Sequence, residues 1–393
     1  MLRVKMYPAR NGDAFLIDAS GTYILVDAGF ANTYSNHVAQ DLAQLSNLGG
    51  RLSLVVCTHI DADHIGGLLE FFSTNGSLAT RAIGVDAVWH NSLRSLPEST
   101  DVPDSIQDLM VLEAVRRRGF PKAPDRSASQ ITALQGSSLA RLLREHDYAW
   151  NAGDGTSSID NKTSPLNLPN GVQIQVIGPM FARLEALRSL WFREMRKLGL
   201  RGGALSSDLV DDAYEMWCSA APQPSFPKAT PIAAKFDRRL SEVYVADKSI
   251  SNGSSIAFVL STGRSRVLFL GDAWAEDIVA ALKPLQTTAS PLLFDAIKVS
   301  HHGSLHNTSE ELLSVIDSPC FLISSDGSHH GHPDFEVLAE IVDRPASFER
   351  KLYFNYATTA SKRLQEHISR SGARFSVHII DDQHWIQMKG SDS

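Results

Sequence analysis

Two histidines and two aspartates lie within six residues of the chain, and their types and spacing suit a metal site. They are His59, Asp61, Asp63 and His64. Crowded together in a folded interior, these side chains would repel and desolvate one another unless a cation neutralised them. Residues 52–57, directly before them, are apolar and β-branched and predict a buried strand. The pattern therefore favours metal ligands at a strand end, and the alternative is a solvated acidic loop.

Five other segments stand along the chain in an order that matches one known family. They are residues 11–17, 24–29, 267–272, 301–304 and 331–333. Together with the run at 59–64, they resemble the motifs of the metallo-β-lactamase superfamily, in the variant that has Asp61 where the commoner form has a second histidine. The likeness is greatest to a subgroup that includes the soluble hydrolase domain of DNA-uptake competence proteins and phosphorylcholine esterase-type phosphodiesterases. The resemblance implies an α/β fold of the α+β kind, the αββα sandwich.

The same resemblance implies two metal ions that share one carboxylate. It assigns His59, Asp61 and Asp272 to the first ion, and Asp63, His64, Asp272 and His302 to the second. The commoner pattern has a further histidine shortly before the strand that leads to the bridging aspartate, but residues 251–256 contain none. Two cations can hold a shared hydroxide and an attacked phosphoryl group. The resemblance therefore implies hydrolysis by a metal-activated hydroxide.

The ligand types also bear on which ion is bound. Imidazole suits Zn²⁺ and other transition ions, whereas carboxylate oxygens favour harder ions such as Mn²⁺. Asp61, in place of a histidine, moves the site toward the harder ions. We expect two divalent ions, with Zn²⁺ preferred over Mn²⁺.

Two further histidines are candidates for contact with the substrate. His301 is interpreted as a substrate or leaving-group contact, and the alternative is a histidine that only supports the ligands. The residues leave open whether His301 or His302 binds metal, and the resemblance favours His302. The resemblance also places His332 on a loop beside the substrate. We expect Asp63 and Asp272, with His301 and His332, to be the catalytic residues.

Two aspartates near the N-terminus receive different interpretations. Asp27 ends a predicted strand and is interpreted as a carboxylate that orients a ligand histidine, since such histidines usually donate their other N–H group. The alternative is an aspartate that only forms a turn. Asp13 is interpreted as a hairpin residue outside the site.

Length, composition and charge limit the class of protein. The 393 residues, 43% of them hydrophobic, can form a sizeable core. We expect a single hydrolase domain over residues 1–393, with helical insertions at about 91–168 and 180–248. No apolar run is long enough for a membrane span, and the N-terminus lacks a secretory pattern, so a cytoplasmic protein is expected. The three cysteines have no ligand spacing and favour buried thiols over disulfides.

Hydrophobic periodicity predicts the elements that position these residues. Gly66 and Gly67 are predicted to permit a tight turn, with a helix starting at residue 68. Other helices are expected at 37–48 and 359–369, with two more within 181–220. The expected strands are 2–7, 14–18, 23–27, 52–57, 87–89, 172–179, 255–261, 266–271 and 350–354.

Two basic segments bear on the substrate. Residues 116–144 contain seven Lys and Arg, and residues 183–201 contain six, in a chain of net charge −7. If these segments flank the site, they favour a phosphate-bearing substrate, and the alternative is two helices with solvated basic faces.

These observations together predict a metal-dependent phosphodiesterase that acts on a nucleic-acid or nucleotide-like phosphodiester. A lactonase or thioesterase on the same fold is one alternative. A non-enzymatic module with a structural metal and a protein partner is another. No membrane partner is expected, and the sequence does not indicate which protein would be the partner.

Overall fold

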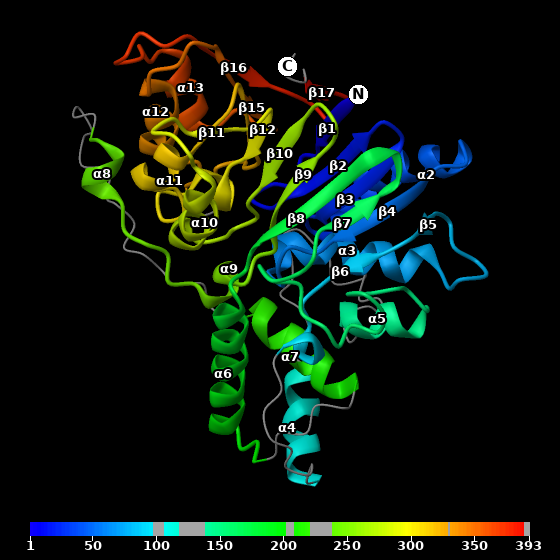
Figure 1. The fold of residues 1–393 in the computed structure, drawn as a ribbon. Helices are drawn as coiled ribbons and strands as arrows, with labels where there is room; N and C mark the ends of the chain where they lie inside the picture. The colour runs from blue at the N-terminus through cyan, green and yellow to red at the C-terminus, as the bar shows by residue number, and fades with distance from the viewer. Residues whose placement is uncertain (97–105, 118–137, 202–207, 221–237, 329–330, 389–393) are drawn as a thin grey trace.

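The fold is a sandwich of two β-sheets with helices on both outer faces (Figure 1). The structure is a computed structural model of the chain, and it describes residues 1–96, 106–117, 138–201, 208–220, 238–328 and 331–388. The order of layers is helix, sheet, sheet, helix, so the predicted αββα architecture is confirmed. No helix among the described residues combines the length and the apolar character needed to cross a membrane.

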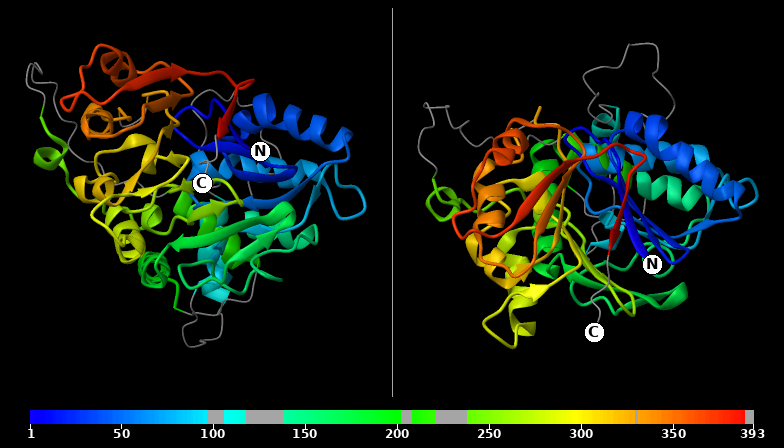
Figure 2. Two further views of the ribbon diagram at one scale, coloured as in Figure 1. Left: turned by 45° about the horizontal axis from the view of Figure 1, so that its top comes forward. Right: turned by 90° about the horizontal axis from the view of Figure 1, so that it is seen from above.

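The first sheet has the strand order β17-β1-β2-β3-β4-β5, with β6 also paired to β4. Its strands are β1 (Leu2–Met6), β2 (Ala14–Ala19), β3 (Thr22–Ala28), β4 (Arg51–Val56), β5 (Gly84–Val85), β6 (Val88–Trp89) and β17 (Trp385–Met388). Strands β3 and β4 are parallel, so their carboxyl ends lie at the same edge. Strand β17 comes from the other end of the chain and pairs with β1, as Figure 2 also shows.

The second sheet has the order β16-β15-β14-β12-β10-β9-β8-β7. Its strands are β7 (Leu166–Leu168), β8 (Val172–Gly178), β9 (Ala257–Ser261), β10 (Arg266–Phe269), β12 (Ala296–Lys298), β14 (Cys320–Ile323), β15 (Arg350–Phe354) and β16 (Phe375–Ile379). Strands β10 and β12 are parallel neighbours. A separate pair is formed by β11 (Leu292–Leu293) and β13 (Ile316–Asp317).

Alternation along the strands builds the core, because successive side chains point to opposite faces. In β2, Phe15 and Ile17 join a layer between the sheets that includes Phe258 and Phe269 of the second sheet. The Phe15 and Phe269 rings meet edge to face, with centroids 5.6 Å apart. Leu16 points the other way, into the layer covered by helices. Because both faces are packed, every residue of β2 is buried.

Helices cover both sheets (Figure 1). On the first sheet lie α1 (Ala31–Thr33), α2 (Ala39–Asn47) and α3 (Ala62–Asn75); on the second lie α10 (Ala275–Leu282), α11 (Glu310–Val315), α12 (Phe335–Asp343) and α13 (Thr359–Gln365). The shorter α8 (Leu240–Val243) and α9 (Ile250–Gly253) precede β9.

Four helices from the two predicted insertions gather at one end of the sandwich (Figure 1). They are α4 (Ile106–Arg116), α5 (Leu139–Glu145), α6 (Phe181–Lys197) and α7 (Asp208–Ala220). Helix α7 packs against both α4 and α5, and α6 packs against α9. Trp191 of α6 meets Tyr214 of α7 edge to face, with ring centroids 5.8 Å apart.

The predicted role of the glycine pair after the metal-ligand run is wrong. Helix α3 begins at Ala62, so Gly66 and Gly67 lie inside it and not in a turn before it. A Cβ atom on Gly67 would lie 2.0 Å from the Ala28 carbonyl oxygen. The missing side chain therefore allows α3 to approach the end of β3 closely, which places the first turn of the helix beside that strand end.

Candidate metal centre

The predicted ligands lie where strands of both sheets end. His59 and Asp61 follow β4, and Asp63 and His64 lie in the first turn of α3. Asp272 follows β10. The fold therefore brings together groups that are more than 200 residues apart in sequence, because the strand ends of the two sheets face each other across the sandwich edge.

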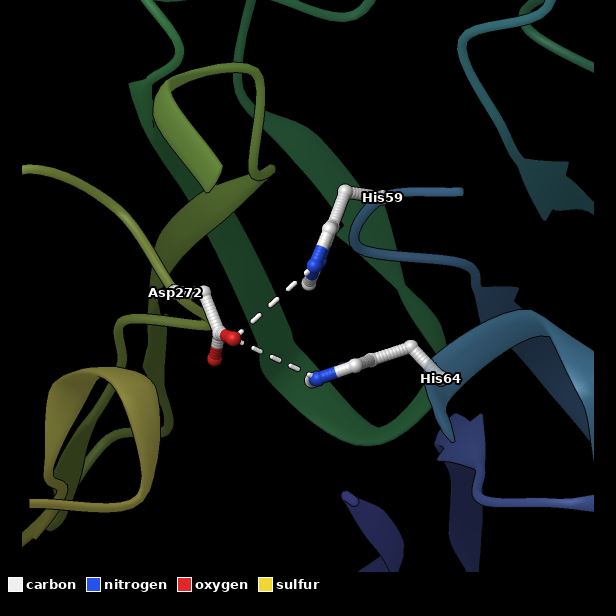
Figure 3. Close-up of side chains that lie close together, drawn as sticks. All are labelled: His59, His64 and Asp272. Carbon is white, nitrogen blue, oxygen red and sulfur yellow. Dashed lines mark ion pairs between the residues drawn. The ribbon is translucent and has the colours of Figure 1, made fainter. Parts of the chain in front are cut away.

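Two histidines and one aspartate form one compact group (Figure 3). The Nε2 atoms of His59 and His64 lie 3.8 Å and 3.5 Å from Oδ2 of Asp272. All three side chains are buried, and the imidazole centroids are 4.2 Å apart. Both rings thus point a nitrogen at the same carboxylate oxygen.

A second group shares His64 and lies on its other side. It consists of Asp63, His64 and His302, whose ligand atoms lie within 4.8 Å of one another. His302 Nε2 is 4.0 Å from Asp63 Oδ2 and 3.7 Å from Asp272 Oδ2. Asn11 donates a hydrogen bond of 2.7 Å to Asp63 Oδ2 and fixes that carboxylate.

Asp61 lies beside His59, with Oδ2 3.5 Å from His59 Nε2. Its other oxygen, Oδ1, accepts a very short hydrogen bond from the Ser251 hydroxyl. Ser251 belongs to α9, in the segment where the commoner motif would have a histidine. In this chain, that segment supports the aspartate through a hydroxyl.

Hydrogen bonds on the Nδ1 atoms direct the Nε2 atoms into the centre. His64 donates from Nδ1 to Asp27 Oδ2 over 2.8 Å, and His302 donates from Nδ1 to the Ser324 carbonyl over 2.9 Å. Asp27 also accepts from the backbone N–H and hydroxyl of Thr58, at 2.7 Å and 2.6 Å. This arrangement resembles that of metal-binding histidines, whose second nitrogen is held by an outer group.

His301 is oriented by a chain of amides. Asn307 donates from Nδ2 to Asp247 Oδ2 and to the Asp272 carbonyl, at 2.9 Å and 3.0 Å. Its Oδ1 therefore faces His301 and accepts from Nδ1 over 2.7 Å, a shorter contact than the 3.3 Å to Asn252. The lone pair of neutral His301 is consequently on Nε2, which lies 3.8 Å from Asp272 Oδ2.

His332 is buried next to His301. The two rings meet edge to face with centroids 5.2 Å apart, and Asp334 Oδ2 lies 3.0 Å from His332 Nδ1. The side chain of His301 is 19% exposed, whereas those of His59 and His64 are not exposed. His301 is therefore more accessible than His59 and His64, whereas His332 is buried beside it.

The residues fit divalent cations on three observations. His59 Nε2 and His64 Nε2 are buried and have no hydrogen-bond partner among the described residues. Burial by itself would lower the pKa of His64, but Asp272 and Asp27 raise it well above its ordinary value, so the centre favours positive charge. Its donors are imidazole nitrogens and carboxylate oxygens, which divalent ions bind.

Sequence reasoning missed two buried charges behind the ligands. Asp13, taken for a hairpin residue, is buried and lies 3.4 Å from His302 Nδ1. It forms a very short ion pair with Lys298 of β12, which is 1% exposed. The available signal was a lysine within the otherwise apolar residues 296–299, since a buried lysine needs a paired charge.

The basic segments are largely engaged within the fold. Arg183 pairs with Asp277 at 2.7 Å, and Arg141 pairs with Asp212 at 3.2 Å. Arg116 pairs with Glu113. Arg118, Lys122 and Arg126 lie outside the described residues, as do His329 and His330. The three cysteines are free and buried, as expected from the sequence.

Comparisons with known proteins extend these observations. Residues 7–127 match the family model of the metallo-beta-lactamase superfamily. No curated protein matches the sequence. Among solved structures, the metallo-beta-lactamase fold protein YhfI from Bacillus subtilis is 10% identical, with 98% of this chain and 100% of that chain covered and a TM-score of 0.37.

Two other solved structures are similar over nearly the whole chain. Igni18, a metallo hydrolase from the archaeon Ignicoccus hospitalis, is 12% identical, with 98% of each chain covered and a TM-score of 0.39. A diphosphatase from the PhnP family is 9% identical, with 99% of each chain covered and a TM-score of 0.41. Identities this low do not indicate a substrate. The match to the metallo-beta-lactamase superfamily model covers residues 7–127, and the αββα architecture agrees with it.

Proposed function

We propose that the chain is a metal-dependent hydrolase that cleaves a phosphodiester of nucleotide-like size. The observation that supports this most is the convergence of four imidazoles on one carboxylate oxygen. Nε2 atoms of His59, His64, His301 and His302 lie 3.5–3.8 Å from Asp272 Oδ2. Three of these rings are buried and one reaches the open side, so the centre combines ligands with a group that can meet a substrate.

Charge supports two ions rather than one. Asp13, Asp27, Asp61, Asp63 and Asp272 surround the centre, and the Lys298 ammonium lies beside two of them, Asp13 and Asp272. With neutral imidazoles, five carboxylates and one ammonium leave an excess of four negative charges, which two divalent cations would balance. We propose Zn²⁺ as the preferred ion and Mn²⁺ as the alternative, on the mixed nitrogen and oxygen donor set.

The proposed ligands divide between the ions through Asp272. His59 and Asp61 would hold the first ion, and Asp63, His64 and His302 the second. When bound, the ions would lower the pKa of water and polarise the phosphoryl group. The protein's part is to fix these donors: Asn11 holds Asp63, Ser251 holds Asp61 and Asp27 holds His64.

Proton transfer to the leaving oxygen is assigned to the exposed side. His301 keeps Nδ1 on Asn307 and presents Nε2, so its imidazolium form can donate the Nε2 proton to an alkoxide. His332, held by Asp334, contacts the His301 ring and lines the same approach. We assign the leaving-group role to these two histidines.

The surroundings favour a compact substrate over a polymer. Arg183, Arg141 and Arg116 are each paired with an acid of the same chain, so they offer less charge to a phosphate backbone than the sequence suggested. Long nucleic acids are bound by rows of such cations. We therefore favour a nucleotide-like diester among the phosphate-bearing substrates.

Hydrolysis of a chromogenic phosphodiester, with Zn²⁺ and with Mn²⁺, tests the proposal. Turnover is expected for wild type and should fall to background in His302→Ala, because the second ion loses a ligand. His384→Ala, an exposed histidine outside the centre, is the matched control and should keep full turnover. Metal-loaded protein that hydrolyses a lactone or thioester, but no phosphodiester, would contradict the assigned substrate class.

A further inference from the structure

Lys298 is a buried lysine that the proposed reaction does not use. It ends β12 and is 1% exposed. Its ammonium donates a hydrogen bond of 2.8 Å to the Gly271 carbonyl and forms a very short ion pair with Asp13. It also lies 3.6 Å from Asp272 Oδ1. These three neighbours all belong to, or directly precede, the residues around the metal centre.

Asp13 is the charged partner of this lysine, whose ammonium the Gly271 carbonyl also holds. The backbone of Asp13 is tied on both sides, because its N–H bonds to the Asp63 carbonyl at 3.3 Å and its carbonyl accepts from Gly29 N–H at 2.8 Å. Burial by itself would raise the pKa of Asp13, but Lys298, His302 and His64 lower it to about 2. The ion pair and these backbone hydrogen bonds therefore hold the carboxylate beside the Lys298 ammonium.

The lysine gives the two oxygens of Asp272 different surroundings. Oδ1 faces the ammonium and has no hydrogen bond among the described residues. Oδ2 faces the imidazoles of His59, His64, His301 and His302. The backbone before Asp272 helps to keep this orientation, because Gly271 has φ +52 and the same ammonium holds its carbonyl.

We propose that Lys298 is a positioning residue that reserves Oδ2 of Asp272 for the metal ions. Carboxylates can bind a cation through one oxygen or through both. With a fixed positive charge beside Oδ1, a divalent cation is repelled from that oxygen, so Asp272 offers one oxygen to both ions. The inference rests on the two-ion centre of the proposed function and is independent of the substrate.

A neutral residue at this position would change the centre in two ways. Asp272 could turn Oδ1 toward one cation and chelate it with both oxygens, which would leave the other ion without its shared ligand. Asp13 would also become a buried carboxylate without its cation, which is costly. The changed role of Asp272 affects ion binding, whereas the unpaired Asp13 carboxylate affects stability. Removing Asp13 as well separates the two effects.

Three variants separate these effects, with Mn²⁺ alone as the probe. Lys298→Met removes the ammonium, Lys298→Met/Asp13→Asn removes both buried charges, and Asp13→Asn keeps the ammonium beside Asp272. Mn²⁺ content and the electron paramagnetic resonance spectrum are measured beside thermal unfolding. A pair of coupled Mn²⁺ ions and isolated Mn²⁺ ions give different spectra. If Lys298 had a purely structural role, its removal would not change the spectrum.

Wild type and Asp13→Asn are expected to bind about two ions per chain with a coupled spectrum. Both variants that lack Lys298 should bind about one, with the spectrum of isolated Mn²⁺, and the double variant should unfold at a higher temperature than Lys298→Met. A folded double variant with two coupled ions would overturn the inference, as would loss of coupling in Asp13→Asn. Wild type with two coupled ions and no phosphodiester turnover would overturn only the proposed substrate.

Discussion

Asp27 shows how single residues outside the ligand set hold the centre. It is fully buried, and its two oxygens accept hydrogen bonds from Thr58 and His64. Its backbone has φ +52, a conformation that non-glycine residues rarely adopt, and the bonds to Thr58 keep it there. Because the carboxylate accepts from His64 Nδ1, the His64 Nε2 lone pair is directed at the centre.

Asp27→Asn should weaken metal binding by about 10–100-fold, because an amide is a weaker acceptor for the His64 N–H group. Competition with a chromogenic chelator measures the affinity. Asp86→Asn, which removes a carboxylate paired with Arg51 at the surface, should leave it unchanged. Equal affinities of wild type and Asp27→Asn would show that Asp27 only shapes the turn, the alternative left open by the sequence.

At the scale of elements, α7 joins the two insertions. Asp212 accepts a hydrogen bond from Ser138 N–H at 2.9 Å, and Glu215 accepts from Leu139 and Ala140 N–H at 2.6 Å and 3.1 Å. These N–H groups open α5, so carboxylates of the second insertion satisfy the first turn of a helix in the other. Glu215 also pairs with His90, just after β6, at 2.8 Å. The helices at this end are thereby linked to the first sheet.

Replacing Glu215 by Ala should lower the free energy of unfolding by about 3 kcal/mol, because buried groups lose a charged partner. Urea unfolding measures this loss. Glu145→Ala, which removes an exposed carboxylate paired with Arg141, should cost less than about 1 kcal/mol. Similar losses in the two variants would mean that α7 is not anchored through Glu215.

Elements with strong hydrophobic periodicity could be predicted from the sequence. Contacts between elements, such as a helix packed closely on a strand end, could not. Strands β3 and β4 were predicted nearly to their ends, since buried strands read as apolar runs. The start of α3 was missed because Gly66 and Gly67 usually mark turns, and only the neighbouring Ala28 carbonyl explains them. The pairing of β17 with β1 joins the two ends of the chain, which no local pattern encodes.

For the whole molecule, the sandwich brings together predicted ligands that no local pattern relates. The run at 59–64 could be recognised alone, but its relation to Asp272 and His302 came from the family resemblance. Asp13 and Lys298 were missed because their charges are satisfied by each other across the two sheets. A buried ion pair of this kind depends on packing between distant segments, so its members look like an ordinary turn and an ordinary strand.

Anomalous diffraction at the zinc edge, from crystals grown with Zn²⁺, would test the two-ion centre most directly. Two peaks are expected, both beside Asp272, one toward His59 and the other toward His302. The pattern follows from the convergence of these side chains on one carboxylate oxygen. Absence of anomalous density beside Asp272, or zinc bound only elsewhere on the chain, would contradict the proposed centre.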